Sequence, residues 1–246
     1  MSKRNAKQKV NKLLVSLILA VILAITGYFT QDILPPTESS NLSNVVVDIN
    51  NIPAYTGSPY VYINNNVPAF TQSDLAIGEI EYYSSLDRLG RCSVTYANIC
   101  KNIMPKEDDE RGSISSVTPS GWKQKSYKGV IEGNYLYNRC HLIGYQLAGE
   151  NANEKNLITG TRYMNTEGML PFENMVAEYI DKHPNNHVLY RVTPVFEGDN
   201  LLASGVQMEA YSIEDDGKGI CFNIYIYNVQ PGIAIDYATG ESKLAE

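Results

Sequence analysis

Residues 138–173 read NRCHLIGYQLAGENANEKNLITGTRYMNTEGMLPFE. This stretch combines a guanidinium, an imidazole, several amides and a carboxylate, and no other window of the chain mixes such groups as densely. Arg139 and His141 are two positions apart, so their side chains face the same way if this part is a strand. The stretch is therefore the candidate active site.

His141 is a candidate general base. A nearby cation such as Arg139 disfavours the protonated imidazole, so the ring stays neutral and can accept a proton at neutral pH. The guanidinium of Arg139 can meanwhile hold a phosphate oxygen with its fork of donors. A packed strand histidine beside a surface arginine fits these two residues, taken alone, equally well.

The amides and the carboxylate further along favour a metal site. Asn165 precedes a predicted helix, where its amide oxygen can bind a hard cation whose other positions hold water, as Mg²⁺ prefers. Glu173 follows eight residues later and can accept hydrogen bonds from those waters. One asparagine at a loop end is commonly a cap or turn residue, but the ordered series Arg-x-His, Asn, Asn, Glu favours catalysis.

This series resembles the signature of the DNA/RNA non-specific endonucleases, which carry a ββα-metal finger. Their signature is Asp-Arg-Gly-His on a strand, then two asparagines nine residues apart and, in some members, a glutamate eight residues later. Here Asn-Arg-Cys-His stands at residues 138–141, followed by Asn156, Asn165 and Glu173 at matching spacings. The resemblance covers roughly residues 80–230.

The resemblance implies a role for each of these residues. His141 would be the general base, Asn165 the protein ligand of Mg²⁺, and Glu173 a carboxylate that orients metal-bound water. Arg139 would stabilise charge on the phosphate, and Asn156 would support the site. The implied cofactor is Mg²⁺, with Mn²⁺ as an alternative, and no small-molecule cofactor is expected.

Two positions depart from that signature. Asn138 replaces the aspartate and removes a negative charge, and Cys140 replaces the glycine and adds a side chain where backbone approaches closely. The alternative to an active nuclease is therefore a catalytically inactive, membrane-tethered protein that binds nucleic acid.

The chain is acidic overall but basic around the candidate site. Its formal net charge is −7, yet residues 111–162 contain seven basic and three acidic residues. Residues 122–128, WKQKSYK, interleave aromatic and basic side chains, which can stack on bases and pair with phosphates. Chance clustering on a solvated face explains such a count equally well. The candidate substrate contacts are Arg111, Lys123, Lys125, Lys128 and Arg162.

The N-terminal region is typical of an export signal. Residues 13–29, LLVSLILAVILAITGYF, are almost entirely apolar and follow a basic flank. This pattern predicts a signal anchor over residues 1–30, a Pro/Ser/Asn-rich linker over 31–44 and an extracellular nuclease domain over 45–246. A cleaved signal peptide, which would release a secreted domain, is the alternative.

The rest of the chain predicts an α+β domain. Apolar residues at helical spacing predict a helix over residues 169–180, with Pro171 in its first turn. Turn residues separate the strand-like runs, which favours antiparallel hairpins. Those runs are residues 45–55, 60–70, 92–97, 129–137, 156–160, 187–196, 201–213 and 220–229. We therefore expect a mostly antiparallel sheet that carries a ββα-metal finger.

The chain contains four cysteines and three histidines. Cys92 and Cys100 would close a small loop if paired, as an exported chain permits. The sequence contains no CxxC motif or Cys/His grouping that indicates a structural zinc site. His183 and His187 flank an HPNNH turn and are interpreted as surface residues.

Together, the resemblance and the N-terminal pattern predict an exported, membrane-anchored, Mg²⁺-dependent endonuclease that is not specific for the sugar. It would hydrolyse phosphodiester bonds of DNA and RNA with little sequence preference, because contacts to the nucleic-acid backbone carry no sequence information. Its partners would be DNA, RNA and the membrane. Its location would be the cell membrane, as a single-pass protein with an extracellular C-terminal domain.

Overall fold

The computed structural model describes residues 51–76, 78–106 and 108–246. All of them belong to one compact unit, Val45–Glu246. The predicted signal anchor and linker lie outside the described residues. In the described part, none of the helices has the length and apolar character needed to cross a membrane.

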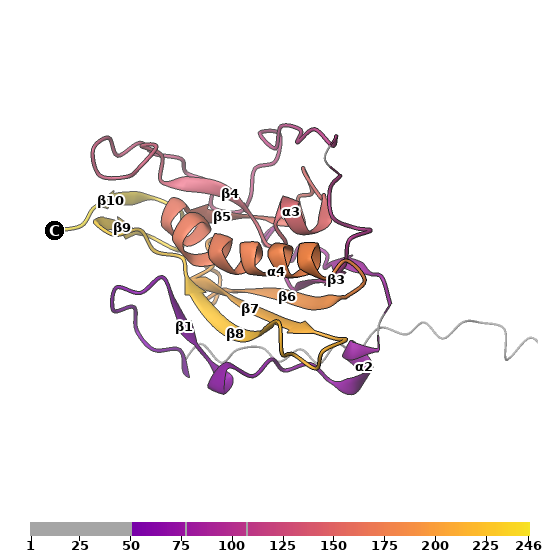
Figure 1. The fold of residues 1–246 in the computed structure, drawn as a ribbon. Coiled ribbons are helices and arrows are strands. Elements are labelled where there is room, and N and C mark those ends of the chain that lie inside the picture. The colour runs from indigo at the N-terminus through magenta and orange to yellow at the C-terminus, as the bar shows by residue number, and fades with distance from the viewer. Residues whose placement is uncertain (1–50, 77, 107) are drawn as a thin grey trace, which may run out of the picture. The chain divides into compact units, whose positions relative to one another are not determined.

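A six-stranded antiparallel sheet is the largest element of the fold, with strand order β1-β8-β7-β6-β3-β2 (Figure 1). Every neighbouring pair in it is antiparallel, as the hairpin-type turns predicted. Its strands are β1 Tyr60–Tyr62, β2 Glu81–Tyr83, β3 Thr95–Ile99, β6 Val188–Val195, β7 Gly205–Ser212 and β8 Cys221–Tyr227.

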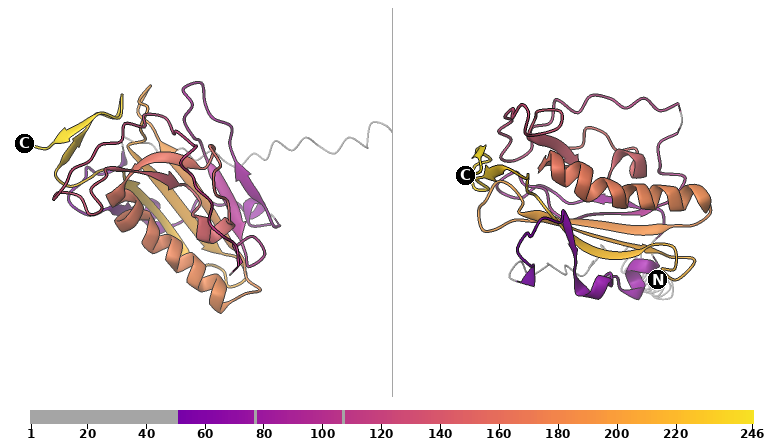
Figure 2. Two further views of the ribbon diagram at one scale, coloured as in Figure 1. Left: turned by 90° about the horizontal axis from the view of Figure 1, so that it is seen from above. Right: turned by 60° about the vertical axis from the view of Figure 1, so that its left-hand side comes forward.

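A hairpin and a helix cover one face of this sheet (Figures 1 and 2). Strand β4, Tyr137–His141, pairs antiparallel with β5, Leu157–Thr161. The chain then passes through a π-helical turn, Met164–Met169, into α4, Leu170–Lys182. Hairpin, helix and sheet share one apolar core, so the core itself positions the predicted ββα unit.

Helix α4 forms where the helical spacing predicted it. Its apolar stripe places Phe172, Val176 and Ile180 in the shared core. Pro171 lies in the first turn of α4, directly after the π-helical turn. Lys182 lies in the last turn, where a cation interacts favourably with the helix dipole.

Short elements complete the described part of the chain. They are η2 Asn64–Asn66, α2 Gln72–Leu75, α3 Tyr145–Ala148, β9 Ile233–Ile235 and β10 Ser242–Leu244. Strands β9 and β10 pair as a small separate hairpin near the C-terminus.

Three sequence-based expectations need correction or qualification. Residues 129–137 do not form a strand pair: Gly129, Gly133 and Asn134 have positive φ, and regular pairing begins only at β4. The strand predicted over 45–55 is absent from its described part, residues 51–55, and the remainder lies outside the described residues. All four cysteines are free, so Cys92 and Cys100 are not paired.

A buried ion pair joins two neighbouring strands at the centre of the large sheet. Arg191 on β6 contacts the Glu209 carboxylate on β7 through Nη2 at 2.7 Å and Nε at 2.8 Å. The other carboxylate oxygen accepts a hydrogen bond from the backbone N–H of Ala69 at 2.8 Å. This ion pair therefore ties the segment before α2 to the centre of the sheet.

We expect Glu209→Gln to lower the free energy of unfolding by about 3–5 kcal/mol, because it leaves the Arg191 charge buried without its partner. Urea denaturation of the variant and the wild type measures the difference. Glu178→Gln is the matched control, because its ion pair with Lys182 is exposed and should contribute little. Equal effects of the two substitutions would contradict the prediction.

Candidate active site

His141 is the last residue of β4 and is 6% exposed. Its Nε2 lies 2.8 Å from the backbone oxygen of Asn151. A carbonyl oxygen can only accept a hydrogen bond, so Nε2 carries the proton and Nδ1 keeps its lone pair in the neutral ring. The Asn151 carbonyl therefore selects the tautomer in which Nδ1 can act as a base.

The surroundings of His141 keep it neutral. Burial lowers the pKa of His141, the positive charge of Arg111 lowers it further, and the hydrogen bond to Asn151 opposes both. The cation that acts on the imidazole is thus Arg111, whereas the sequence pointed to Arg139.

Arg139 makes its contacts elsewhere. Its Nε and Nη2 donate to the backbone oxygens of Val117 and Ser115, and its guanidinium lies 4.3 Å from the centre of the Trp122 ring. Its long side chain reaches an adjacent loop from β4. Arg139 holds the loop that follows Arg111.

Asn156 immediately precedes β5 and is fully buried, and both ends of its amide hydrogen-bond to the same residue, Ile143. Its Oδ1 accepts from the backbone N–H of Ile143 at 2.9 Å, and its Nδ2 donates to the Ile143 carbonyl at 3.0 Å. Asn156 is therefore a positioning residue that fixes how the chain leaves β4, rather than a group directed at a substrate.

Asn165 lies in the π-helical turn before α4. The Cys140 thiol donates to its Oδ1 at 2.9 Å. An amide oxygen has two lone pairs, so one remains for a cation. A Cβ built on Gly160 would lie 2.7 Å from the Cβ of Cys140, so the glycine in the partner strand provides the space for the cysteine.

Glu173 lies in the first turn of α4 and is buried beside Gly144. A Cβ on Gly144 would lie 2.8 Å from both Cδ and Oε2 of Glu173, so a side chain at this position would displace the Glu173 carboxylate. Burial raises the pKa of Glu173 to about 7, against the lowering effects of Arg111 and of a hydrogen bond from Gln146. Arg111 thus acts on both Glu173 and His141.

The other four predicted substrate contacts lie in three places. Lys125 donates to the backbone oxygen of Ser242 at 2.8 Å, and Lys123 lies 3.8 Å from the Glu241 carboxylate, so both contact the C-terminal β9–β10 region. Lys128 is exposed. Arg162 follows β5, with its guanidinium near Gly133. Only Arg111 of the five is brought to His141 and Glu173.

Sequence reasoning missed several residues at this site. Gln146 in α3 contacts Glu173 and also donates to Asn174 at 3.0 Å. The Tyr145 ring centre lies 5.4 Å from the Arg111 guanidinium. The Tyr190 hydroxyl on β6 is buried without a hydrogen-bond partner among the described residues, and its pKa is raised by burial and by Glu173 and Cys140. No motif marks these positions, because only the folded core brings them together.

The family model for DNA/RNA non-specific endonuclease matches residues 71–214. The chain belongs to this family. The match spans β3, the whole ββα unit, β6 and β7, and therefore contains His141, Asn165 and Glu173. It confirms the predicted family.

A curated deoxyribonuclease from Streptococcus dysgalactiae subsp. equisimilis is 27% identical over 196 residues. That alignment covers 64% of this chain but only 59% of the relative, so the chain spans less than two thirds of the relative's length. This similarity therefore supports the family assignment only, and the activity of this chain is a proposal.

Two solved nuclease structures have the same fold. NucA from Streptococcus agalactiae with a magnesium ion bound has a TM-score of 0.68 and 27% identity over 80% of this chain and 92% of its own. The Sda1 nuclease with a bound zinc ion has a TM-score of 0.62 and 25% identity over 77% of this chain and 97% of its own. These similarities confirm the predicted α+β fold.

The residues of this endonuclease family member also fit a hard divalent cation. Asn165 presents an amide oxygen with a free lone pair, and Glu173 presents a carboxylate from the adjacent turn. Oxygen donors of this kind, few in number and supplemented by water, are the set that Mg²⁺ prefers.

We expect the Mg²⁺ affinity of the metal-free protein to fall as the pH drops below about 7. Below that pH Glu173, whose pKa is raised to about 7, is increasingly protonated and loses the charge that favours the cation. Isothermal titration calorimetry across pH 5.5 to 8.5 measures this dependence.

Glu173→Gln should bind Mg²⁺ more weakly and without this pH dependence, because the amide does not titrate. Glu178→Gln, which removes an exposed carboxylate from the same helix, should behave like the wild type. A Glu173→Gln variant with an unchanged pH profile would show that another group causes the dependence.

Proposed function

We propose that this protein is an exported, membrane-anchored, Mg²⁺-dependent endonuclease that cleaves DNA and RNA with little sequence preference. The observation that carries the proposal is the hydrogen bond from His141 Nε2 to the Asn151 carbonyl, which leaves Nδ1 as a base on the same ββα unit as Asn165 and Glu173. Membership of the DNA/RNA non-specific endonuclease family supports it.

The proposed reaction is phosphodiester hydrolysis by an activated water. His141 Nδ1 takes a proton from the water, whose oxygen attacks phosphorus while the 3′ oxygen leaves on the opposite side. A divalent cation held at Asn165, Mg²⁺ or alternatively Mn²⁺, would stabilise the negative charge that develops on the phosphate. Glu173 would orient the waters around that cation.

Arg111 is the arginine best placed to contact the phosphate. Its positive charge acts on both His141 and Glu173, whereas the guanidinium of Arg139 is already engaged by two loop carbonyls and Trp122. A guanidinium near the scissile phosphate neutralises charge that accumulates in the transition state. We therefore assign to Arg111 the role that the motif implied for Arg139.

Membrane anchoring and export rest on the N-terminal sequence. The basic flank followed by the apolar residues 13–29 supports a single-pass anchor with the nuclease domain outside the cell, and cleavage of that segment would release a secreted enzyme. Because the chain carries a net charge of −7, its affinity for nucleic acid depends on a local basic region and should fall with salt.

A catalytically inactive nucleic-acid-binding protein is the second candidate. Asn138 and Cys140 depart from the motif, which favours it. Against it, the partner strand accommodates Cys140 at Gly160, and the thiol leaves a lone pair on Asn165 Oδ1. The departures therefore leave the proposed catalytic groups in place.

We expect the purified protein to convert supercoiled plasmid to nicked and linear forms when Mg²⁺ is present. His141→Ala should lower the rate by about 10² or more, because it removes the general base. His183→Ala is the matched control, because its ring packs on Tyr179 just beyond the end of α4. Intact plasmid across Mg²⁺, Mn²⁺ and a range of pH would favour the inactive binding protein.

We expect Arg111→Ala to lower kcat/KM by about tenfold or more, the size expected when a hydrogen bond to a charged group is lost. Lys123→Ala should have a much smaller effect, because Lys123 faces the C-terminal hairpin. Steady-state cleavage of a fluorogenic oligonucleotide measures both variants. The assignment of Arg111 would be wrong if the two substitutions had similar effects, or if Arg139→Ala reduced turnover while Arg111→Ala did not.

A further inference from the structure

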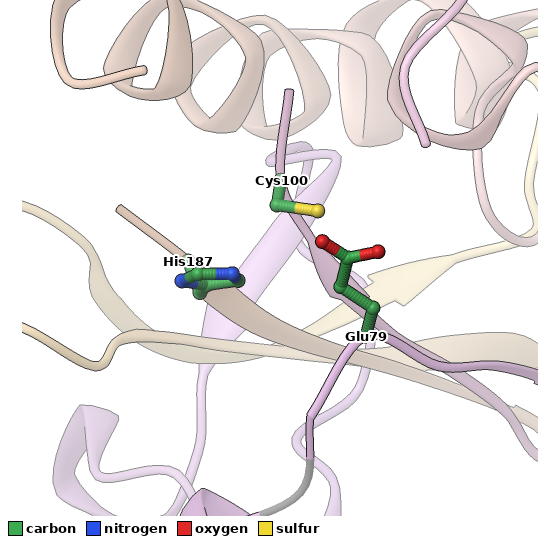
Figure 3. Close-up of side chains that lie close together, drawn as sticks. All are labelled: Glu79, Cys100 and His187. Atoms are coloured by element: carbon green, nitrogen blue, oxygen red, sulfur yellow. The ribbon is translucent and has the colours of Figure 1, made fainter. Parts of the chain in front are cut away.

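A second group of metal-ligating side chains lies outside the candidate active site. It consists of Glu79, Cys100 and His187, shown in Figure 3, and the potential ligand atoms all lie within 4.8 Å of one another. Glu79 precedes β2, Cys100 follows β3 and His187 precedes β6. None of the three belongs to the proposed catalytic set.

Strand pairing explains why these residues meet. Ile99 on β3 is paired with Val188 on β6, so the next antiparallel pair outward places Cys100 opposite His187. The backbone N–H of Asn98 donates to the Ile80 carbonyl at 2.9 Å, which holds the segment containing Glu79 beside the end of β3. Adjacent strand ends of the large sheet thus supply all three side chains.

Neighbouring residues orient two of these side chains. The Nδ1 of His187 lies 2.6 Å from Glu214 Oε1, which leaves Nε2 available as a ligand. Metal-binding histidines commonly donate their second ring N–H to a carboxylate in this way. Asn102 donates to Glu79 Oε1 at 2.6 Å, which leaves Oε2 available.

The donor set indicates the metal. A thiolate, an imidazole and a carboxylate suit Zn²⁺, whereas Mg²⁺ prefers oxygen ligands alone. Cys100 is buried, His187 is half-buried and Glu79 is exposed, so a cation and a water as fourth ligand can reach the group from the Glu79 side. The thiolate and the carboxylate together would balance the charge of a divalent ion.

We propose that Glu79, Cys100 and His187 form a second metal site that binds Zn²⁺, with Glu214 positioning His187. The ion connects the segment before β2 to the ends of β3 and β6. The chain is also held where it leaves β3, because the Cys100 carbonyl accepts hydrogen bonds from the backbone N–H groups of Ile103 and Met104. The site is independent of the proposed nuclease activity.

Cobalt spectroscopy on the full-length chain, stripped with a chelator, tests the site directly. Co²⁺ bound to a cysteine thiolate produces a sulfur-to-metal charge-transfer band that oxygen and nitrogen ligands do not produce. We expect this band on Co²⁺ titration and its loss when Zn²⁺ displaces Co²⁺. Cys100→Ser should abolish the band, and Glu214→Gln should weaken Co²⁺ binding by about tenfold or more.

Glu79→Gln tests the site without disturbing the core, because Glu79 is exposed and glutamine has nearly the same shape. We expect it to weaken Co²⁺ binding by about tenfold or more while circular dichroism stays unchanged. Cys221→Ser, at an exposed cysteine, and Asn165→Ala, at the proposed active-site ligand, should both retain the band.

Three outcomes for the charge-transfer band would overturn the proposal. These are absence of the band in the wild type, a band that survives Cys100→Ser, and a band that is lost in Asn165→Ala. An undiminished Co²⁺ affinity in Glu79→Gln would exclude Glu79 as a ligand and so overturn the three-residue site.

Discussion

The amide of Asn156 makes two buried hydrogen bonds with the backbone of Ile143, and the geometry of the candidate active site depends on them. A buried backbone N–H and C=O need partners, and one side chain supplies both here. The bonds fix the chain just after His141 and before Gly144, where Glu173 approaches. The same two hydrogen bonds therefore help to position both His141 and Glu173, although one residue lies on β4 and the other on α4.

Burial has opposite consequences for the two titratable groups of the active site. It disfavours the charged form of each, so the pKa of His141 falls and the pKa of Glu173 rises. A neutral imidazole is ready to accept a proton, whereas a protonated glutamate cannot orient metal-bound water. Arg111 lowers the pKa of both groups, which favours the neutral base and the ionised carboxylate together.

The two proposed metal sites would differ in the cation that they prefer. Amide and carboxylate oxygens near the π-helical turn favour a hard cation, whereas the thiol and imidazole at the ends of β3 and β6 favour a softer one. The site at Asn165 would leave most coordination positions of its cation to water and substrate. The site at Cys100 would use three protein ligands to join strand ends, which suits a structural role.

The sequence by itself determined the family, the antiparallel α+β fold, helix α4 and the motif from Asn138 to Glu173, because periodicity, turn residues and motif spacing are local properties. Tertiary structure alone decided that Arg111 acts on His141 and that the Asn156 side chain hydrogen-bonds to the backbone. It also decided that Glu79, Cys100 and His187 lie together. Residues distant in the chain become neighbours only through strand register and a shared core. The contacts of a long side chain such as that of Arg139 depend on which of these neighbours lie within its reach.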